Sequence, residues 1–162
     1  MYLNELLEKL EYTKLQGELK ISITNLIYDS RKATKGSVFV CISGAITDGH
    51  SYIDDVAKKG AVAIVVERDV EYPEGLTVIK VADTRKALAR MSAAYFDYPA
   101  EKLTTIGITG TKGKTTTTYM MKAILEAIGI KTGLIGTNEM IIGDRAIPSS
   151  HSTPESYVIQ ET

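Results

Sequence analysis

The sequence is poor in cysteine, in excess charge and in long apolar runs, and each scarcity excludes a class of protein. Its single cysteine, Cys41, excludes an internal disulfide and fits a reducing compartment. With 19 Lys and Arg residues against 20 Asp and Glu residues, the net charge of −1 gives no field that favours nucleic acid or anionic lipid. No apolar run approaches the roughly 20 residues that span a bilayer, and the charged segment MYLNELLEKL is not a signal peptide. We therefore expect a cytoplasmic protein that binds no nucleic acid and does not insert into a membrane.

Residues 1–98 alternate short apolar runs with amphipathic segments, which predicts a layered α/β domain. Cys41 lies in one of the apolar runs, so a buried thiol is predicted in preference to a reactive one. Ser51 and Asp83 are expected to cap two of the helices, and Gly60 to end the first of these. The expected strands are 25–31, 37–42, 61–66 and 76–81, and the expected helices are 3–10, 51–60 and 83–95.

A second segment begins at a proline and a polar pair, so we place a domain boundary at 98–99. Strands are expected over 103–109, 130–135 and 140–142, with helices over 114–128 and from Thr153. Met120, Ile124 and Ile128 are expected on one apolar stripe of the first helix. With about 60 residues, this part is too small for a robust core. It also has no acidic residue at the end of a later apolar strand, where nucleotide-hydrolysing folds usually hold magnesium. We expect the chain to be the N-terminal part of a longer protein.

The most informative motif is the glycine-rich turn Gly110-Thr111-Lys112-Gly113-Lys114-Thr115-Thr116, between a predicted strand and a predicted helix. Backbone N–H groups of such a turn surround phosphate oxygens, and the helix N-terminus adds positive potential. Lys114 is expected to reach the β- and γ-phosphates of a nucleotide, and the Thr115 hydroxyl to bind Mg²⁺. The spacing is shorter than G-x-x-x-x-G-K-[ST], and the structural alternative is a glycine-rich turn with an unrelated lysine. Lys112 is either a second phosphate-binding cation or a solvated turn residue.

The four consecutive threonines from Thr115 to Thr118 are poor helix formers for an exposed first turn. Hydroxyl donors that face phosphate explain them better than helix propensity does. This observation adds to the prediction that the turn holds a nucleotide.

The motif GTKGKTTTT resembles the nucleotide motif of the Mur ligase family, ATP-dependent enzymes that join amino acids to the peptidoglycan precursor. The segments 28–31, 35–40 and 44–50 resemble that family's DSR, G-x-x-F-x-A and G-x-x-x-DGH patterns. The run Ser152-Thr153-Pro154-Glu155 is similar to the branch that adds the third amino acid, diaminopimelate or lysine, to UDP-MurNAc-L-Ala-D-Glu. The resemblance extends from about residue 27 to the chain end and implies a UDP-sugar-binding domain at 1–98 and the truncated start of an ATP-binding domain at 99–162.

The resemblance also implies roles for individual residues. Residues 110–116 would hold ATP, with Lys114 catalytic and Thr115 on Mg²⁺. The residues expected to contact the UDP-linked substrate are Ser30, Ala45, Ile46, Thr47, Ser152 and Thr153.

Several of these positions have structural alternatives. Ser30 follows a strand end, where open α/β sheets bind ligands, but a serine there also caps its own turn. Asp29 and Arg31 are interpreted first as a local ion pair, and His50 first as a structural residue. His151 is either a solvated histidine or a ligand-binding one.

The implied reaction begins when a substrate carboxylate attacks the ATP γ-phosphate and forms an acyl phosphate, from which an amine then displaces phosphate. It requires charge neutralisation and positioning more than a protein nucleophile. Because the family's remaining catalytic groups would lie beyond Thr162, we expect this chain alone not to catalyse ligation. The alternatives are the Mur ligase that adds the terminal dipeptide, a stand-alone nucleotide-binding module, and an unrelated P-loop kinase or ATPase.

Overall fold

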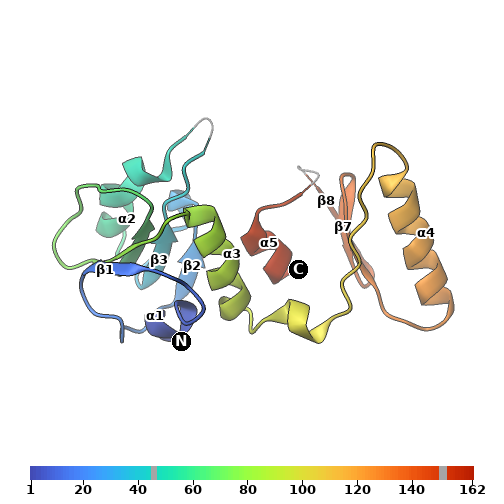
Figure 1. Cartoon of the computed structure of the whole chain (residues 1–162), viewed down its shortest axis with the longest axis horizontal. Coiled ribbons are helices and arrows are strands. Elements are labelled where there is room, and N and C mark those ends of the chain that lie inside the picture. Colours follow the sequence, from blue (N-terminus) through green and yellow to red (C-terminus); the bar gives the residue numbers. More distant parts are fainter. Residues whose placement is uncertain (45–46, 150–152) are drawn as a thin grey trace. The chain divides into compact units, whose positions relative to one another are not determined.

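The computed structural model describes residues 1–44, 47–149 and 153–162, and it confirms the α/β class (Figure 1). The chain divides into two compact units, Met1–Tyr98 and Pro99–Thr162. Among the described residues, no helix has the length and hydropathy required to cross a membrane.

The first unit is built on a five-stranded sheet in the order β1-β5-β4-β3-β2. Strands β2 to β5 are parallel to their neighbours, and β1 pairs antiparallel with β5 at one edge. The strands are β1 (Thr13–Gln16), β2 (Asn25–Ile27), β3 (Ser37–Val40), β4 (Ala63–Val66) and β5 (Thr77–Lys80), and the α-helices are α1 (Leu3–Leu6), α2 (Ile53–Lys58) and α3 (Thr84–Tyr95).

Both faces of this sheet are covered, and the sequence shows why. Every residue of β3 and β4 is buried, as expected for continuous apolar runs in a parallel sheet. Phe39 and Ile64 on one face pack in a cluster with Val56 of α2. Side chains alternate along a strand, so Val38 and Val40 lie on the opposite face, and α3 contacts β2 and β3. The core of the unit therefore has two apolar layers.

Several local expectations for the first unit are confirmed. The side chain of Asp83 accepts a hydrogen bond from the Lys86 amide and caps α3. Gly60 lies just after α2 with a φ of +91°, the left-handed conformation that ends helices at glycine. Cys41 is fully buried, and burial raises the pKa of its thiol. The cysteine is therefore a core residue and not a nucleophile.

Three details of the first unit differ from the sequence prediction. Ser51 does not cap α2; it lies inside a 3-10 turn, Gly49–Tyr52, whose cap is Asp48. The first helix ends at Leu6, earlier than its apolar period suggests. Strand β1 was not predicted because its residues lack an alternating pattern, and pairing with β5 places them at an exposed edge.

The second unit contains a long helix and a small antiparallel sheet in the order β6-β7-β8. Helix α4 follows Gly113, and Gly129 ends it with a φ of +84°, as predicted. Strand β8 was not predicted. The elements are α4 (Lys114–Ala127), β6 (Gly133–Ile135), β7 (Glu139–Ile142), β8 (Arg145–Pro148) and α5 (Ser156–Glu161), with a 3-10 turn at Pro99–Lys102.

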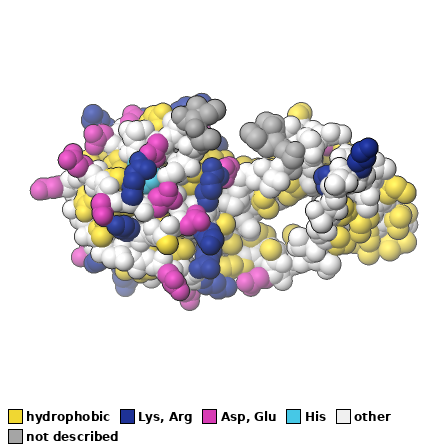
Figure 2. Space-filling view, turned by 45° about the horizontal axis from the view of Figure 1, so that its top comes forward, with side chains coloured by type: hydrophobic (Ala, Val, Ile, Leu, Met, Phe, Trp, Pro, Cys, Tyr) yellow, Lys and Arg dark blue, Asp and Glu magenta, His cyan; other side chains and the backbone are white. Residues whose placement is uncertain are grey.

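Two predictions for the second unit are wrong, and the predicted apolar stripe of α4 is exposed. The segment 103–109 is not a strand, because no described strand pairs with it, and Leu103 is 69% exposed. The stripe Met120, Ile124 and Ile128 is exposed, and hydrophobic side chains gather over α4 in Figure 2. Helix α5 begins at Ser156 after a Glu155 cap, two residues later than a Thr153 cap would place it.

Candidate functional site

The carboxyl ends of the parallel strands gather polar side chains at one edge of the first sheet. Ser30 follows β2, Asp48 follows β3, Glu67 follows β4 and Thr84 follows β5. Parallel strands direct their carboxyl ends to the same edge, where open α/β sheets bind ligands. This edge is the candidate binding site of the first unit.

The turn around Ser30 is fixed by charged neighbours. Asp29 accepts hydrogen bonds from the Arg31 amide at 3.0 Å and from the Arg31 guanidinium at 2.7 Å. The hydrogen bond from the guanidinium is the main cause that lowers the pKa of Asp29 to about 2. The predicted ion pair is therefore confirmed. Ser30 itself is buried, and its carbonyl accepts from Lys59 Nζ at 3.0 Å.

Lys59 is a residue of this edge that the sequence did not reveal. It follows α2 and bridges the Ser30 carbonyl and the Asp55 carboxylate, which is 2.7 Å from its Nζ. Lys58 and Lys59 are adjacent and chemically identical in the sequence. Only the tertiary structure shows which of the two reaches the Ser30 turn.

The Asp29 carboxylate predicts a pH dependence of stability. Because its pKa is lowered from 3.8 to about 2, its contribution is present above pH 3.8 and is lost as the pH falls through about 2. We expect Asp29→Asn to lower the free energy of unfolding by about 1 kcal/mol at pH 7, a discounted figure because Arg31 is solvent-exposed. Urea unfolding at pH 7 and at pH 2.5 should show this difference shrinking. Asp69→Asn, which removes an exposed ion pair with Lys80, is the control and should cost less than about 0.5 kcal/mol.

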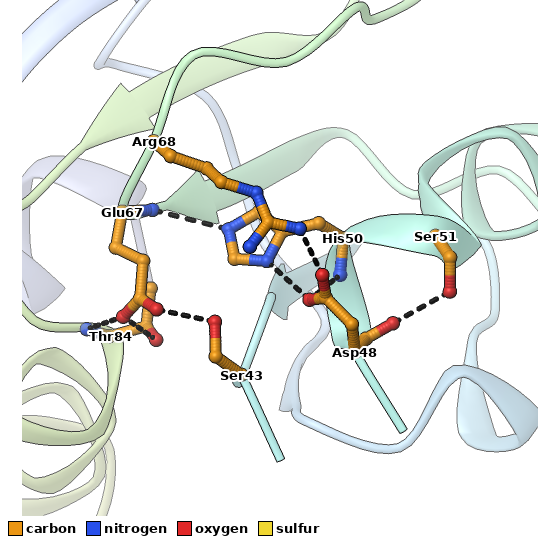
Figure 3. A network of polar contacts seen from close by, with 7 residues as sticks. All are labelled: Ser43, Asp48, His50, Ser51, Glu67, Arg68 and Thr84. Carbon is orange, nitrogen blue, oxygen red and sulfur yellow. Dashed lines mark hydrogen bonds and ion pairs between the residues drawn. The ribbon is translucent and has the colours of Figure 1, made fainter. Parts of the chain in front are cut away.

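His50 lies at the centre of a polar network beside this edge (Figure 3). Its side chain is 2% exposed, and its Nδ1 lies 2.7 Å from Asp48 Oδ1. Its Nε2 accepts a hydrogen bond from the Glu67 amide at 3.3 Å. Both ring nitrogens therefore have protein partners, and the geometry supports the structural interpretation of this histidine.

Asp48 and Glu67 hold the rest of this network together. Burial alone would raise the pKa of Asp48, but hydrogen bonds from His50 and Arg68 outweigh burial and lower it to about 2. A hydrogen bond from Ser43 is the main cause that lowers the pKa of Glu67, and Thr84 donates to the same carboxylate. Both carboxylates are therefore held in the charged form by directed donors.

The connection after β3 carries three of the predicted substrate contacts. Ala45 and Ile46 lie outside the described residues, as do Ser152 and His151 near the chain end. Thr47 is exposed, and its carbonyl accepts from the Gly44 amide at 3.1 Å. A Cβ at Gly49 would lie 2.7 Å from the Ile42 amide nitrogen, so only glycine fits there. The structure thus places Ser30 and Thr47 at the same sheet edge.

The glycine-rich turn belongs to the second unit and leads directly into α4. Gly113 is the helix N-cap with a φ of +78°, and Gly110 has a φ of +151°, so both adopt conformations that favour glycine. Lys114 Nζ lies 2.5 Å from the Gly110 carbonyl and therefore folds back over the turn. The first-turn amides of α4 are free of intrahelical partners at this point. Glycine conformation, lysine and helix terminus together form an anion-binding arrangement.

The threonines after Lys114 divide into two groups. Thr117 and Thr118 donate to the carbonyls of Gly113 and Thr115 at 2.9 and 2.7 Å. This corrects the expectation that all four hydroxyls serve phosphate, because back-bonding satisfies two of them within the helix. Thr115 and Thr116 are the members left for a ligand.

The donor set fits a nucleotide phosphate better than it fits a metal held by the chain alone. No group of three His, Cys, Asp or Glu residues within 1–44, 47–149 and 153–162 could hold a metal ion. Thr115 offers one hydroxyl, so Mg²⁺ at this turn would take its other ligands from phosphate oxygens and water. Thr153, another of the predicted substrate contacts, is exposed and precedes α5.

The parallel sheet with its polar carboxyl edge and the separate glycine turn before a helix define an α/β protein with two candidate ligand sites. Two family models match the chain: "Mur ligase family, catalytic domain" over residues 22–96 and "Mur ligase middle domain" over residues 108–162. The chain belongs to the Mur ligase family.

Relatives with high identity are longer than this chain. The UDP-N-acetylmuramoyl-L-alanyl-D-glutamate--2,6-diaminopimelate ligase of Clostridium perfringens is 48% identical over 99% of the chain, which spans 33% of that protein. The enzyme of the same name from Clostridium botulinum is 49% identical, with 99% of the chain and 34% of that protein covered. The chain thus spans about a third of the length of these relatives.

Two solved structures share the fold. A UDP-N-acetylmuramoyl-L-alanyl-D-glutamate--2,6-diaminopimelate ligase superimposes with a TM-score of 0.73 at 19% identity, over 99% of this chain and 32% of the other. A UDP-N-acetylmuramoylalanyl-D-glutamyl-2,6-diaminopimelate--D-alanyl-D-alanyl ligase from Acinetobacter baumannii gives 0.60 at 28% identity, over 83% of this chain and 30% of the other. The first of these comparisons supports the fold alone.

Proposed function

We propose that this chain belongs to an ATP-dependent ligase that adds diaminopimelate to UDP-MurNAc-L-Ala-D-Glu in peptidoglycan precursor synthesis. The observation that carries the proposal is the identity of 48% across both units with a ligase of that name. The sequence left diaminopimelate and lysine open, and the names of the relatives favour diaminopimelate. A cytoplasmic location follows for an enzyme of nucleotide-linked precursors.

The two units bind different ligands in this proposal. Residues 1–98 bind the UDP-sugar at the carboxyl edge of their sheet, with Ser30 and Thr47 among the contacts. Residues 99–162 begin the ATP-binding domain, in which Gly110 to Thr116 surround the phosphates. The length of the relatives and the exposed apolar stripe of α4 support a larger domain around this second unit.

The proposed reaction requires the chain to bind phosphate and to neutralise its negative charge. Lys114, the turn amides and the α4 N-terminus lower the energy of negative charge that develops when a substrate carboxylate attacks the γ-phosphate. Thr115 contributes one oxygen to Mg²⁺, which neutralises phosphate charge when bound. Positioning of the carboxylate favours formation of the acyl phosphate. Positioning of the amine then allows it to displace phosphate and form the amide bond.

Calorimetric titration of the 162-residue chain tests the proposal. We expect saturable binding of ATP with Mg²⁺ and of UDP-MurNAc-L-Ala-D-Glu, with weaker binding of the tripeptide form and no ligation by the chain alone. Tighter binding of the tripeptide form would favour the dipeptide-adding branch. ATP binding without any UDP-ligand binding would favour an unrelated P-loop protein, and turnover by the isolated chain would contradict its expected inactivity.

A further inference from the structure

We propose that His50 and Glu67 are positioning residues that fix Ser43 and Asp48, the two ends of the β3–α2 connection, for binding of the UDP-sugar. The inference rests on the proposed function, because Thr47 lies in this connection and Ser30 lies at the same sheet edge. In this proposal neither His50 nor Glu67 touches the UDP-sugar itself. Their role follows from what each of them joins (Figure 3).

His50 joins the far end of the connection to the end of β4. Asp48 Oδ1 accepts a hydrogen bond from the His50 amide at 3.0 Å and lies 2.7 Å from the ring Nδ1 of His50. The opposite ring nitrogen accepts from the Glu67 amide. A buried imidazole with partners on both nitrogens has one orientation, so it holds Asp48 at a fixed distance from β4.

Glu67 joins the near end of the connection to the start of α3. One carboxylate oxygen accepts from the Ser43 hydroxyl, and the other accepts from Thr84 N at 3.0 Å and from Thr84 Oγ1 at 2.7 Å. Ser43 and Asp48 also form an isolated β-bridge. The two ends of the connection are therefore tied to each other, to β4 and to α3.

This arrangement favours a role in binding over a role in stability alone. Only His50 and Thr84 of this cluster are buried, and ion pairs that are partly exposed contribute little to the free energy of unfolding, so stability by itself is a weak reason for the cluster. Ser43 and Asp48 are each held by directed hydrogen bonds, so they lose less conformational freedom when a ligand docks beside them. The cluster lies where strands β3, β4 and β5 end, beside the edge assigned to the UDP-sugar.

Binding measurements on four variants of the full 162-residue chain test the inference. His50→Phe fills the ring volume without the hydrogen bonds, and Glu67→Ala removes the carboxylate. Glu67→Gln keeps one acceptor oxygen for Thr84 and turns an amide donor toward the Ser43 hydroxyl, which can accept from it. Thr77→Val is the matched control, because Thr77 is a buried hydroxyl that bonds Glu18 at the opposite end of the parallel strands. Circular dichroism and urea unfolding establish that each variant is folded.

We expect His50→Phe and Glu67→Ala to raise the Kd for UDP-MurNAc-L-Ala-D-Glu at least tenfold and to leave the Kd for ATP within twofold. Glu67→Gln should recover most of the loss, and Thr77→Val should change neither Kd. An unchanged UDP-ligand Kd in folded His50→Phe and Glu67→Ala overturns the inference while the proposed function stands. A wild-type chain that does not bind the UDP ligand overturns the proposed function and the inference with it.

Discussion

Lys114→Met is expected to weaken ATP binding about 100-fold, because it removes charge-assisted hydrogen bonds worth roughly 3 kcal/mol from the phosphate site. The lysine stands at the first position of α4 and folds over the turn, with Nζ 2.5 Å from the Gly110 carbonyl. When phosphate binds, Lys114 Nζ would leave the Gly110 carbonyl and contact the anion instead. Titration of ATP in the presence of Mg²⁺ measures the effect.

Lys131→Met is the matched control for this variant. It removes the same charge from an exposed position past the far end of α4, so ATP affinity should change less than twofold. Lys112→Met decides between the two interpretations of the second turn lysine. Its removal raises the Kd for ATP only if Lys112 is a phosphate-binding cation. Equal ATP affinity of Lys114→Met and the wild type would contradict the assignment of the turn as a phosphate site.

Phe39→Ala is expected to lower the free energy of unfolding of the first unit by about 3–5 kcal/mol. Phe39 is 1% exposed at the centre of β3, where it packs against neighbouring strands and α2. Removal of the ring leaves a cavity that a close-packed sheet layer does not refill. Urea unfolding followed by circular dichroism measures the change.

Leu15→Ala provides the comparison for this core variant. Leu15 lies on the exposed edge strand β1, so its loss should cost less than about 1 kcal/mol. A loss below 1 kcal/mol for Phe39→Ala would show that the sheet layer relaxes around the gap. It would contradict a core centred on β3.

Sequence reasoning located the candidate binding positions but not the residues that support them. Ser30 was found because it follows a strand end in a motif. Lys59 reaches that motif only through the tertiary fold, and Glu67 and Arg68 reach the segment 43–50 in the same way. Their chemistry, charged side chains on a surface, is that of many solvated residues, so nothing local distinguishes them.

Predictions failed where an element depends on a partner. The segment 103–109 has strand-like residues, but a strand exists only through hydrogen bonds to a neighbour. The apolar stripe of α4 was predicted because it is a property of the helix alone, whereas its burial requires a second surface. Ser51 does not act as a cap because Asp48 caps the 3-10 turn and the Ser51 hydroxyl donates to the Asp48 carbonyl.

The sequence by itself determined the α/β class, the buried strands, the stop at Gly129 and the glycine-rich turn, because hydrophobic period and glycine conformation are local properties of the chain. Tertiary structure alone decided that β1 completes the first sheet and that Lys59, and not Lys58, reaches Ser30. It also decided that His50, Glu67 and Arg68 share one network. Those outcomes depend on strand order and register, which bring together side chains that are distant along the chain.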